Sequence, residues 1–150
     1  MNYNGQTFLK QFLPSLLQHN IPNNQIHIAD NGSTDDSIAW LKQHYPQLIL
    51  HELGLNHGFA QGYNEALQQI EADYFVLLNS DVEVTANWLN PVIQLMEADR
   101  TIAAAQPKIR AFNNRSFFEH AGASGGWIDI LGFTFCRGRL FVQVEKYQGQ

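Results

Sequence analysis

The stretch formed by residues 74–83 constrains the fold of this chain more than any other part of the sequence. An apolar run, Tyr-Phe-Val-Leu-Leu, is followed at once by Asn79, Asp81 and Glu83. A short continuous apolar run is typical of a strand in a parallel sheet that is covered on both faces. Open α/β sheets bind ligands just beyond the carboxyl ends of such strands. We therefore expect a buried strand from residue 74 that delivers Asp81 to a metal or phosphate site.

The composition indicates one ordinary globular domain. The chain has 150 residues, of which 45% are hydrophobic and 15% charged, and this is too short for two large domains. The formal net charge is -5 and the nine Lys and Arg are scattered, so no basic stripe can follow a phosphate backbone. Nucleic acid is therefore not an expected partner.

The sequence also bears on the compartment. A single cysteine, Cys136, excludes an internal disulfide framework and fits a reducing compartment. The sequence has neither an apolar run of about 18 residues nor a signal-peptide pattern at residues 1–5. We expect a cytoplasmic protein, with peripheral attachment at the inner face of the membrane as an alternative.

Predicted helices alternate with predicted strands at short intervals. The expected helices cover residues 8–17, 38–45, 58–70 and about 85–96, and the expected strands cover 25–30, 48–53 and the run from 74. This alternation predicts an α/β fold with a parallel sheet and crossover helices. Asn4 or Thr7 is the expected cap of the first helix, and Pro14 is expected to bend or split it. Residues 112–126 are expected to be irregular, and residues 138–144 to form a further strand.

The turn at residues 30–37 follows a predicted strand and begins a helix, and two roles stay open for it. In a structural role, Gly32 permits a tight turn, Ser33 or Thr34 caps the helix, and Asp35 complements the helix dipole. That role does not require Asp30, the last residue of the strand. Its carboxylate would face the ligand crevice, where it could accept N–H donors from a nucleotide base.

A second strand-to-helix junction lies at residues 56–64. Its glycines could expose amides to an anion at the start of a helix. The alternative, which we favour for this stretch alone, is that Gly58 permits the turn and Gly62 permits close packing. His57 is expected in a turn or at the surface rather than on a metal, since no second His or Cys lies at ligand spacing.

The polar end of the apolar run could form a metal site built from oxygen ligands. Mg²⁺ commonly uses one or two carboxylates together with substrate phosphates. Asp81 is the expected ligand for Mg²⁺ or Mn²⁺, whereas Glu83 shares its face only if the strand continues. The alternative is a strand end that is merely polar.

In their order along the chain, these motifs resemble those of family 2 glycosyltransferases, which are inverting enzymes with a GT-A fold, and particularly the bacterial rhamnosyltransferase-like branch. Residues 2–5 resemble the end of the family's first strand, 30–35 its base-binding turn, and 56–64 its glycine-containing helix start. Residues 77–83 resemble its metal motif, usually Asp-x-Asp, and residues 132–139 resemble a downstream segment of the branch. The resemblance spans nearly the whole chain.

The resemblance implies a GT-A-like (Rossmann-like) fold with a mostly parallel sheet flanked by helices, in incomplete form. It implies that residues 1–150 are a single donor domain that binds a nucleotide diphosphate sugar. The family's reaction transfers the sugar to an acceptor hydroxyl with inversion, and the acceptor would be a glycan or a lipid-linked molecule of cell-surface polysaccharide biosynthesis. The residues implied in donor binding are Tyr3, Asp30, Ser33, Gly58, Asn64, Asn79 and Asp81.

Within that set, Tyr3 and Asp30 would contact the nucleoside, and Asp81 would hold the diphosphate through Mg²⁺ or Mn²⁺. Asn79 departs from the family pattern, because it replaces the first aspartate of the metal motif with a neutral and weaker ligand. The catalytic base is expected outside this chain, so no catalytic residue is assigned and turnover by this chain alone stays open. The alternative function is a non-catalytic remnant that serves as a nucleotide-binding or assembly module.

The resemblance also implies that the chain lacks the family's first strand and its acceptor-binding part. A missing inner strand would leave ladder groups unpaired and apolar faces exposed. We expect either that another strand fills the gap, with residues 139–144 as one candidate, or that the protein associates with itself through the incomplete sheet.

Overall fold

The computed structural model describes residues 1–119, 126–136, 139–140 and 143–144. The chain divides into two compact units, Met1–Ala86 (unit 1) and Asn87–Gln150 (unit 2). The assignment of residues 1–150 to one donor domain stays a prediction.

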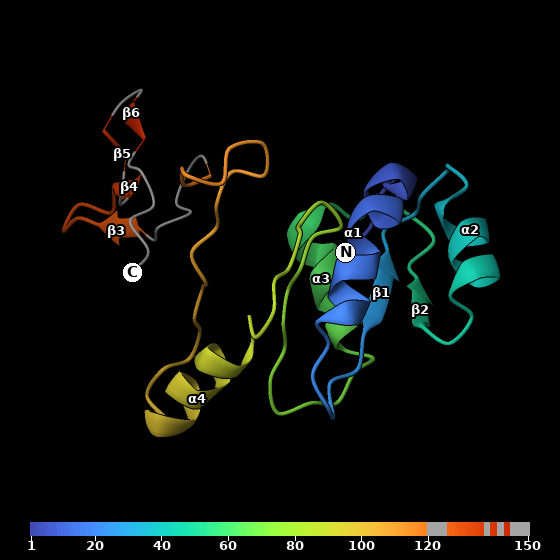
Figure 1. The fold of residues 1–150 in the computed structure, drawn as a ribbon, viewed down its shortest axis with the longest axis horizontal. Helices are drawn as coiled ribbons and strands as arrows, with labels where there is room; N and C mark the ends of the chain where they lie inside the picture. The colour runs from blue at the N-terminus through green and yellow to red at the C-terminus, as the bar shows by residue number, and fades with distance from the viewer. Residues whose placement is uncertain (120–125, 137–138, 141–142, 145–150) are drawn as a thin grey trace. The chain divides into compact units, whose positions relative to one another are not determined.

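Unit 1 alternates helices and strands around a short parallel pair (Figure 1). Its elements are α1 (Gln6–Gln18), β1 (His27–Asp30), α2 (Ser37–His44), β2 (Ile49–Glu52) and α3 (Phe59–Leu67). β1 and β2 are parallel, with Ile28 opposite Leu50. The predicted α/β class, with a parallel sheet and crossover helices, is confirmed.

A third backbone segment reaches the other edge of β1. Asn2 forms an isolated parallel bridge with Asp30: its N–H donates to the Ala29 carbonyl at 2.8 Å, and its carbonyl accepts from Asn31 N–H at 2.8 Å. The Asp30 carbonyl instead accepts from Leu53 N–H, next to β2. Because successive carbonyls of a strand point to opposite edges, Asn2 and β2 flank β1.

The core of unit 1 lies on one face of the parallel pair. Leu9 and Leu13 of α1, Ile28 of β1 and Leu41 of α2 form a buried cluster. Burying each such side chain contributes about 1.5–3 kcal/mol relative to leaving it exposed. Alternation places His51 on the opposite face, where its Nδ1 lies 3.0 Å from Oε1 of Gln69, just beyond α3. Helices therefore lie on both faces of the sheet.

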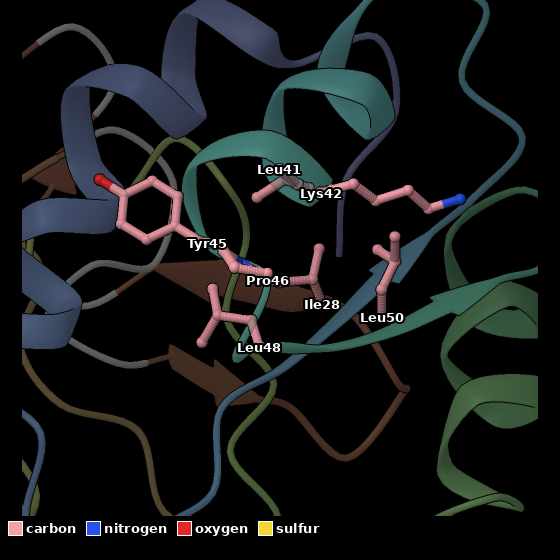
Figure 2. A pocket seen from close by; sticks show the side chains of 7 residues that line it. All are labelled: Ile28, Leu41, Lys42, Tyr45, Pro46, Leu48 and Leu50. Atoms are coloured by element: carbon pink, nitrogen blue, oxygen red, sulfur yellow. The ribbon is translucent and has the colours of Figure 1, made fainter.

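A small apolar cavity of about 50 Å³ lies between α2 and the two strands (Figure 2). Ile28, Leu48 and Leu50 point into it from the sheet side. The Lys42 ammonium points away from it and pairs with Glu52 at 2.7 Å. With so little space and an apolar lining, the cavity is a packing defect of the core rather than a ligand site.

α1 differs from prediction in its start, and of the two effects expected of Pro14 the split does not occur. It begins at Gln6, after Gly5, with no side-chain cap, so neither Asn4 nor Thr7 caps it. Pro14 lies inside the helix, yet the helix is not split. Phe12 and Leu13, which precede the proline, are buried, and this packing holds the helix together across the missing hydrogen bond.

The largest correction concerns residues 74–81, which form no strand. Phe75, Val76 and Leu77 are 47%, 48% and 54% exposed, so the predicted burial is also wrong. The Met1 amine donates to the Leu78 carbonyl at 2.8 Å, while Asn2 pairs with β1. Met1 and Asn2 thus connect β1 to the polar end of the apolar run. A segment of two residues is too short to form backbone hydrogen bonds along the whole run.

Unit 2 contains α4 (Asn90–Ala98), β3 (Gly126–Ile128), β4 (Thr134–Cys136), β5 (Arg139–Leu140) and β6 (Gln143–Val144). α4 begins later than predicted, since Pro91 favours its first turn and Thr85 does not cap it. β3 and β4 are antiparallel. No helix among the residues described is long and apolar enough to cross a membrane.

The predicted strand at residues 138–144 is replaced by two short strands. β5 and β6 pair with each other in antiparallel fashion, so the suggestion that residues 139–144 fill the gap beside β1 is wrong. Gly138, Phe141 and Val142 lie outside the described residues. Phe118, within the segment 112–126 expected to be irregular, forms an antiparallel bridge with Arg110, and residues 120–125 lie outside the description. Self-association through the sheet stays a prediction.

Leu41→Ala tests the core. Leu41 is buried within the cluster shared by α1, β1 and α2, so the change should lower the free energy of unfolding by about 2–5 kcal/mol. Leu55→Ala is the control, because Leu55 is 71% exposed and should change stability by no more than about 0.5 kcal/mol. Urea denaturation measures both, and equal effects would contradict the described core.

The pair His27–His51 predicts a pH dependence of stability. The ring nitrogens lie 2.8 Å apart, and burial, followed by the neighbouring His51, lowers the pKa of His27 from 6.5. The unfolded chain then binds more protons as the pH falls below about 6.5, so stability should decrease there. His27→Gln should flatten the pH dependence of the urea midpoint between about pH 5 and pH 7. An unchanged slope would show that His27 is not the group responsible.

Candidate functional site

The buried side chain of Asn2 links the edge of β1 to the turn that follows it. Asn2 is 1% exposed, and its Nδ2 donates to Asp30 Oδ1 at 2.8 Å and to the hydroxyls of Ser33 and Ser37 at 3.1 Å each. A Cβ on residue 5 would lie 2.4 Å from Asn2 Oδ1, so Gly5 is required for the amide to take this position. Asn2 therefore holds both ends of the turn.

The carboxylate of Asp30 is directed into this turn. Its Oδ2 accepts from Ser33 N–H at 2.9 Å and its Oδ1 from the Ser33 hydroxyl at 2.5 Å, in addition to the bond from Asn2. Asp30 is buried. Three bonds do not use all the lone pairs of a carboxylate, so Oδ2 keeps acceptor capacity for one more donor. The predicted contacts of Asp30 and Ser33 with a nucleoside stay predictions.

Asn4 and Asp35 tie the N-terminal segment to the start of α2. Asn4 Oδ1 accepts from Thr34 N–H at 2.7 Å, and Asp35 Oδ2 accepts from Gln6 N–H at 3.1 Å. Asp35 Oδ1 also accepts from the N–H and hydroxyl of Ser37. Burial opposes ionisation of Asp35, but these hydrogen bonds outweigh it and lower the pKa of the carboxyl. Asp35, rather than Ser33 or Thr34, thus satisfies the first amide of the helix.

Asn31 joins the turns that follow β1 and β2. Its Nδ2 donates to Asn56 Oδ1 and to the Gly58 carbonyl at 3.0 Å each, and its Oδ1 accepts from His57 N–H at 3.0 Å. Gly58 N–H donates to Asn56 Oδ1 at 2.9 Å. The amide of Gly58 is therefore engaged within the chain, as its structural role predicts, and anion binding by Gly58 stays a prediction.

The two turns also pack against each other. Gly32 has φ +75°, and a Cβ there would lie 2.5 Å from the backbone of Leu55. A Cβ on Gly62 would lie 3.0 Å from Asn31 Oδ1. Both glycines permit close approach at the carboxyl ends of the strands, so the structural explanation of Gly32 and Gly62 is supported. His57 pairs with Glu65 at 3.2 Å on the surface of α3.

The polar end of the apolar run meets α3 through Tyr63. The Tyr63 hydroxyl donates to Asn79 Oδ1 at 3.2 Å. Burial, and then the negative charge of Asp81, raise the pKa of Tyr63 to about 12. Asp81 itself is exposed. Asn79 and Asp81 therefore lie near Tyr63 of α3, next to the Leu78 carbonyl that accepts from the Met1 amine, although no strand delivers them.

The donor set of this edge bears on metal binding. Among the residues described, no three His, Cys, Asp or Glu side chains gather where they could hold a metal ion. One exposed carboxylate, that of Asp81, fits a hard cation only if a diphosphate and water supply the other ligands. Asp81 is the residue that could hold Mg²⁺ or Mn²⁺ on such terms, whereas the Asn79 oxygen is already bonded to Tyr63.

The remaining predicted residues lie nearby at the surface. Tyr3 is half exposed, between Asn2 and Asn4 of the network. Asn64 is exposed on α3. The structure therefore brings Ser33 and Asp30 together, and Asn79 and Asp81 together, and leaves Tyr3 and Asn64 exposed beside them.

Comparison with protein families decides the family of the chain. A model described as glycosyl transferase family 2 matches residues 1–144. This chain belongs to glycosyl transferase family 2. The polar edge of unit 1 is the candidate site of this family 2 chain, and its role in binding stays a prediction.

Three known proteins illustrate what this family 2 chain is similar to. It is 28% identical over 88 residues to a teichoic acid poly(glycerol phosphate) polymerase of Staphylococcus epidermidis, covering 56% of this chain and 12% of that protein. It is 26% identical over 116 residues to a hyaluronan synthase of Streptococcus pyogenes, covering 72% of this chain and 27% of the synthase. The crystal structure of S. aureus TarS matches with a TM-score of 0.64 at 21% identity, covering 81% of this chain and 23% of that one.

These comparisons set the limits of what is shown. The likeness to TarS supports a GT-A-like α/β fold, in partial form. The chain spans about an eighth and about a quarter of the length of the two curated relatives. The rhamnosyltransferase-like branch is not among these matches.

Sequence reasoning missed the residues that organise this candidate site. Asn2, Asn31 and Tyr63 bond across 16 to 35 positions of the chain, and none was singled out for such a role. A signal was present, because polar amides directly before or after a strand need partners when they are buried. The identity of those partners depends on the folded arrangement.

Asn2→Ala tests the network. The change removes the donor that serves Asp30, Ser33 and Ser37 and should lower stability by about 1–3 kcal/mol. Asn20→Ala is the matched control, since its amide donates to the Asn24 carbonyl in an exposed turn. Chemical denaturation measures both. If the two variants lose equal stability, Asn2 does not organise the turn.

Proposed function

We propose that this chain is the part of a glycosyltransferase that binds a nucleotide diphosphate sugar. The observation that carries the proposal is the family 2 match over residues 1–144, and the bonds of Asp30 with Asn2 and of Asn79 with Tyr63 support it. The reaction we propose for the whole protein is transfer of the sugar, with inversion, to an acceptor hydroxyl on a glycan or lipid-linked molecule. We place it in the cytoplasm, in the synthesis of a cell-surface polysaccharide.

The proposed binding mode assigns one part of the donor to each part of the edge. The nucleoside lies against Tyr3 and the turn that begins at Asp30, where the Oδ2 atom has capacity for a further N–H donor. The diphosphate lies near Asp81, and Asn64 and Gly58 border it on the α3 side. Mg²⁺ or Mn²⁺, held by Asp81 and the diphosphate, would offset the charge that develops on the departing nucleotide.

The proposed branch is the rhamnosyltransferase-like one. Its support is the resemblance of residues 132–139 to a segment of that branch. The polymers in the names of the two relatives, teichoic acid and hyaluronan, support a product at the cell surface.

A second candidate is a non-catalytic module for nucleotide binding or assembly. Two observations favour it: Asn79 stands where the family has an aspartate, and the Asp30 carboxylate is already bonded by Asn2 and Ser33. In this case Asp30→Ala would leave the association with a partner protein unchanged.

Thermal shifts with nucleotides test the leading proposal. UDP, dTDP or GDP with Mn²⁺ should raise the melting temperature, since a ligand at 100 times its Kd contributes about 2.7 kcal/mol to stability. Asp81→Ala should abolish the shift because it removes the carboxylate that holds the cation. Glu83→Ala is the control, since Glu83 is an exposed acid two residues away that the proposal assigns no role.

Two outcomes would contradict the proposal. If none of these nucleotides shifts the melting temperature of the folded wild type, donor binding is excluded. If Asp81→Ala and Glu83→Ala reduce the shift equally, the effect is one of net charge and Asp81 is not the cation ligand.

A further inference from the structure

The hairpin of β3 and β4 carries a strongly apolar tip. Ile130, Leu131 and Phe133 are 100%, 78% and 69% exposed. Single exposed apolar side chains are ordinary on protein surfaces, but three large ones in four consecutive positions are not. A cluster of this kind indicates a surface that becomes buried from solvent on binding.

Backbone N–H groups of the tip are hydrogen-bonded within the tip, which lowers the free-energy cost of removing them from water. Asp129 Oδ1 accepts from the N–H groups of Leu131 and Phe133 at 2.9 Å each. The Asp129 carbonyl accepts from Gly132 N–H at 3.0 Å, and Asp129 N–H donates to the Phe133 carbonyl at 3.0 Å. Gly132, at φ +87°, permits the turn that closes these bonds. A peptide N–H without a partner costs several kcal/mol in an apolar medium, and the N–H groups of Leu131, Gly132 and Phe133 have partners within the tip.

The charge of the chain is divided unevenly between the units. Unit 2 contains seven of the nine Lys and Arg but five of the fourteen Asp and Glu, so its formal net charge is +2, whereas that of unit 1 is -7. The apolar tip therefore belongs to the positive unit of a protein that is negative as a whole. Apolar side chains combined with positive charge are the pattern that binds the surface of an anionic bilayer.

We propose that the tip formed by residues 130–133 inserts into the interface of an anionic lipid bilayer and anchors the protein there peripherally. The three apolar side chains enter the boundary between headgroups and acyl chains, and the net positive charge of unit 2 is attracted to the anionic headgroups. An anchor of this size binds weakly and reversibly. The proposal does not depend on nucleotide binding.

Vesicle co-sedimentation of the full chain tests the proposal. The wild type should sediment with phosphatidylcholine vesicles that contain about 30% phosphatidylglycerol, and bind several-fold less to pure phosphatidylcholine, because anionic lipid attracts positive charge. Raising the salt from about 0.1 M to 0.5 M should weaken binding, since the screening length shortens. Leu131→Ser/Phe133→Ser should lower the partition coefficient about tenfold or more.

The variants are matched so that a folding defect cannot imitate the result. Leu131 and Phe133 are exposed, and only their backbone N–H groups bond to Asp129. Replacing their side chains should therefore keep the wild-type circular dichroism and melting temperature. Leu95→Ser is the control, since Leu95 is a half-exposed apolar residue of the same unit, on α4, and should keep wild-type binding. Ile130→Asp places a charge at the fully exposed position and should also abolish binding.

Three results would overturn the proposal. The first is a wild type that does not sediment with anionic vesicles. The second is a folded double variant that binds them as well as the wild type. The third is that the double variant changes the sedimentation coefficient of the protein without lipid, which would identify the tip as a contact between copies of the chain.

Discussion

The hydrogen bonds of the Asn2 amide hold together the polar edge of unit 1. One buried nitrogen serves Asp30, Ser33 and Ser37, and the backbone of the same residue pairs with β1. A buried polar group that lost these partners would carry its full desolvation cost, so the turn after β1 has little freedom to take another form. Asn31 extends the same principle to the turn after β2. The edge is therefore organised by buried amide side chains together with the carboxylates of Asp30 and Asp35.

This organisation explains how a site can persist beside so small a sheet. Two four-residue parallel strands make few ladder hydrogen bonds, and the apolar run that would be their natural neighbour stays exposed. The helices supply the packing contacts that so small a sheet lacks. α1 and α2 bury one face of the sheet, and α3 positions Tyr63 against Asn79. The polar ends are thus fixed by helices and turns, and they keep their places although residues 74–78 do not pair.

The alternation of elements was predictable because it depends on local periodicity, as the strands at His27–Asp30 and Ile49–Glu52 show. The polar residues at the strand ends were predictable for the same reason. Predictions that required knowledge of a neighbour were less successful. The run at residues 74–78 has the composition of a buried strand, but composition cannot supply the partner that a strand needs. Pro14 is the reverse case, in which packing of Phe12 and Leu13 outweighed a local preference against a helix.

The sequence by itself determined the class of the fold and the family, since both follow from the order of apolar and polar segments along the chain. It also indicated Asp30 and Asp81 as candidate site residues. Only the tertiary structure decided what these residues do there. The Asp30 carboxylate is turned into a network centred on Asn2, and Asp81 lies exposed near Tyr63, because such contacts join positions far apart in the chain. Hydrogen-bond partners are chosen by proximity in space, and proximity is set by the packing of the helices against the sheet.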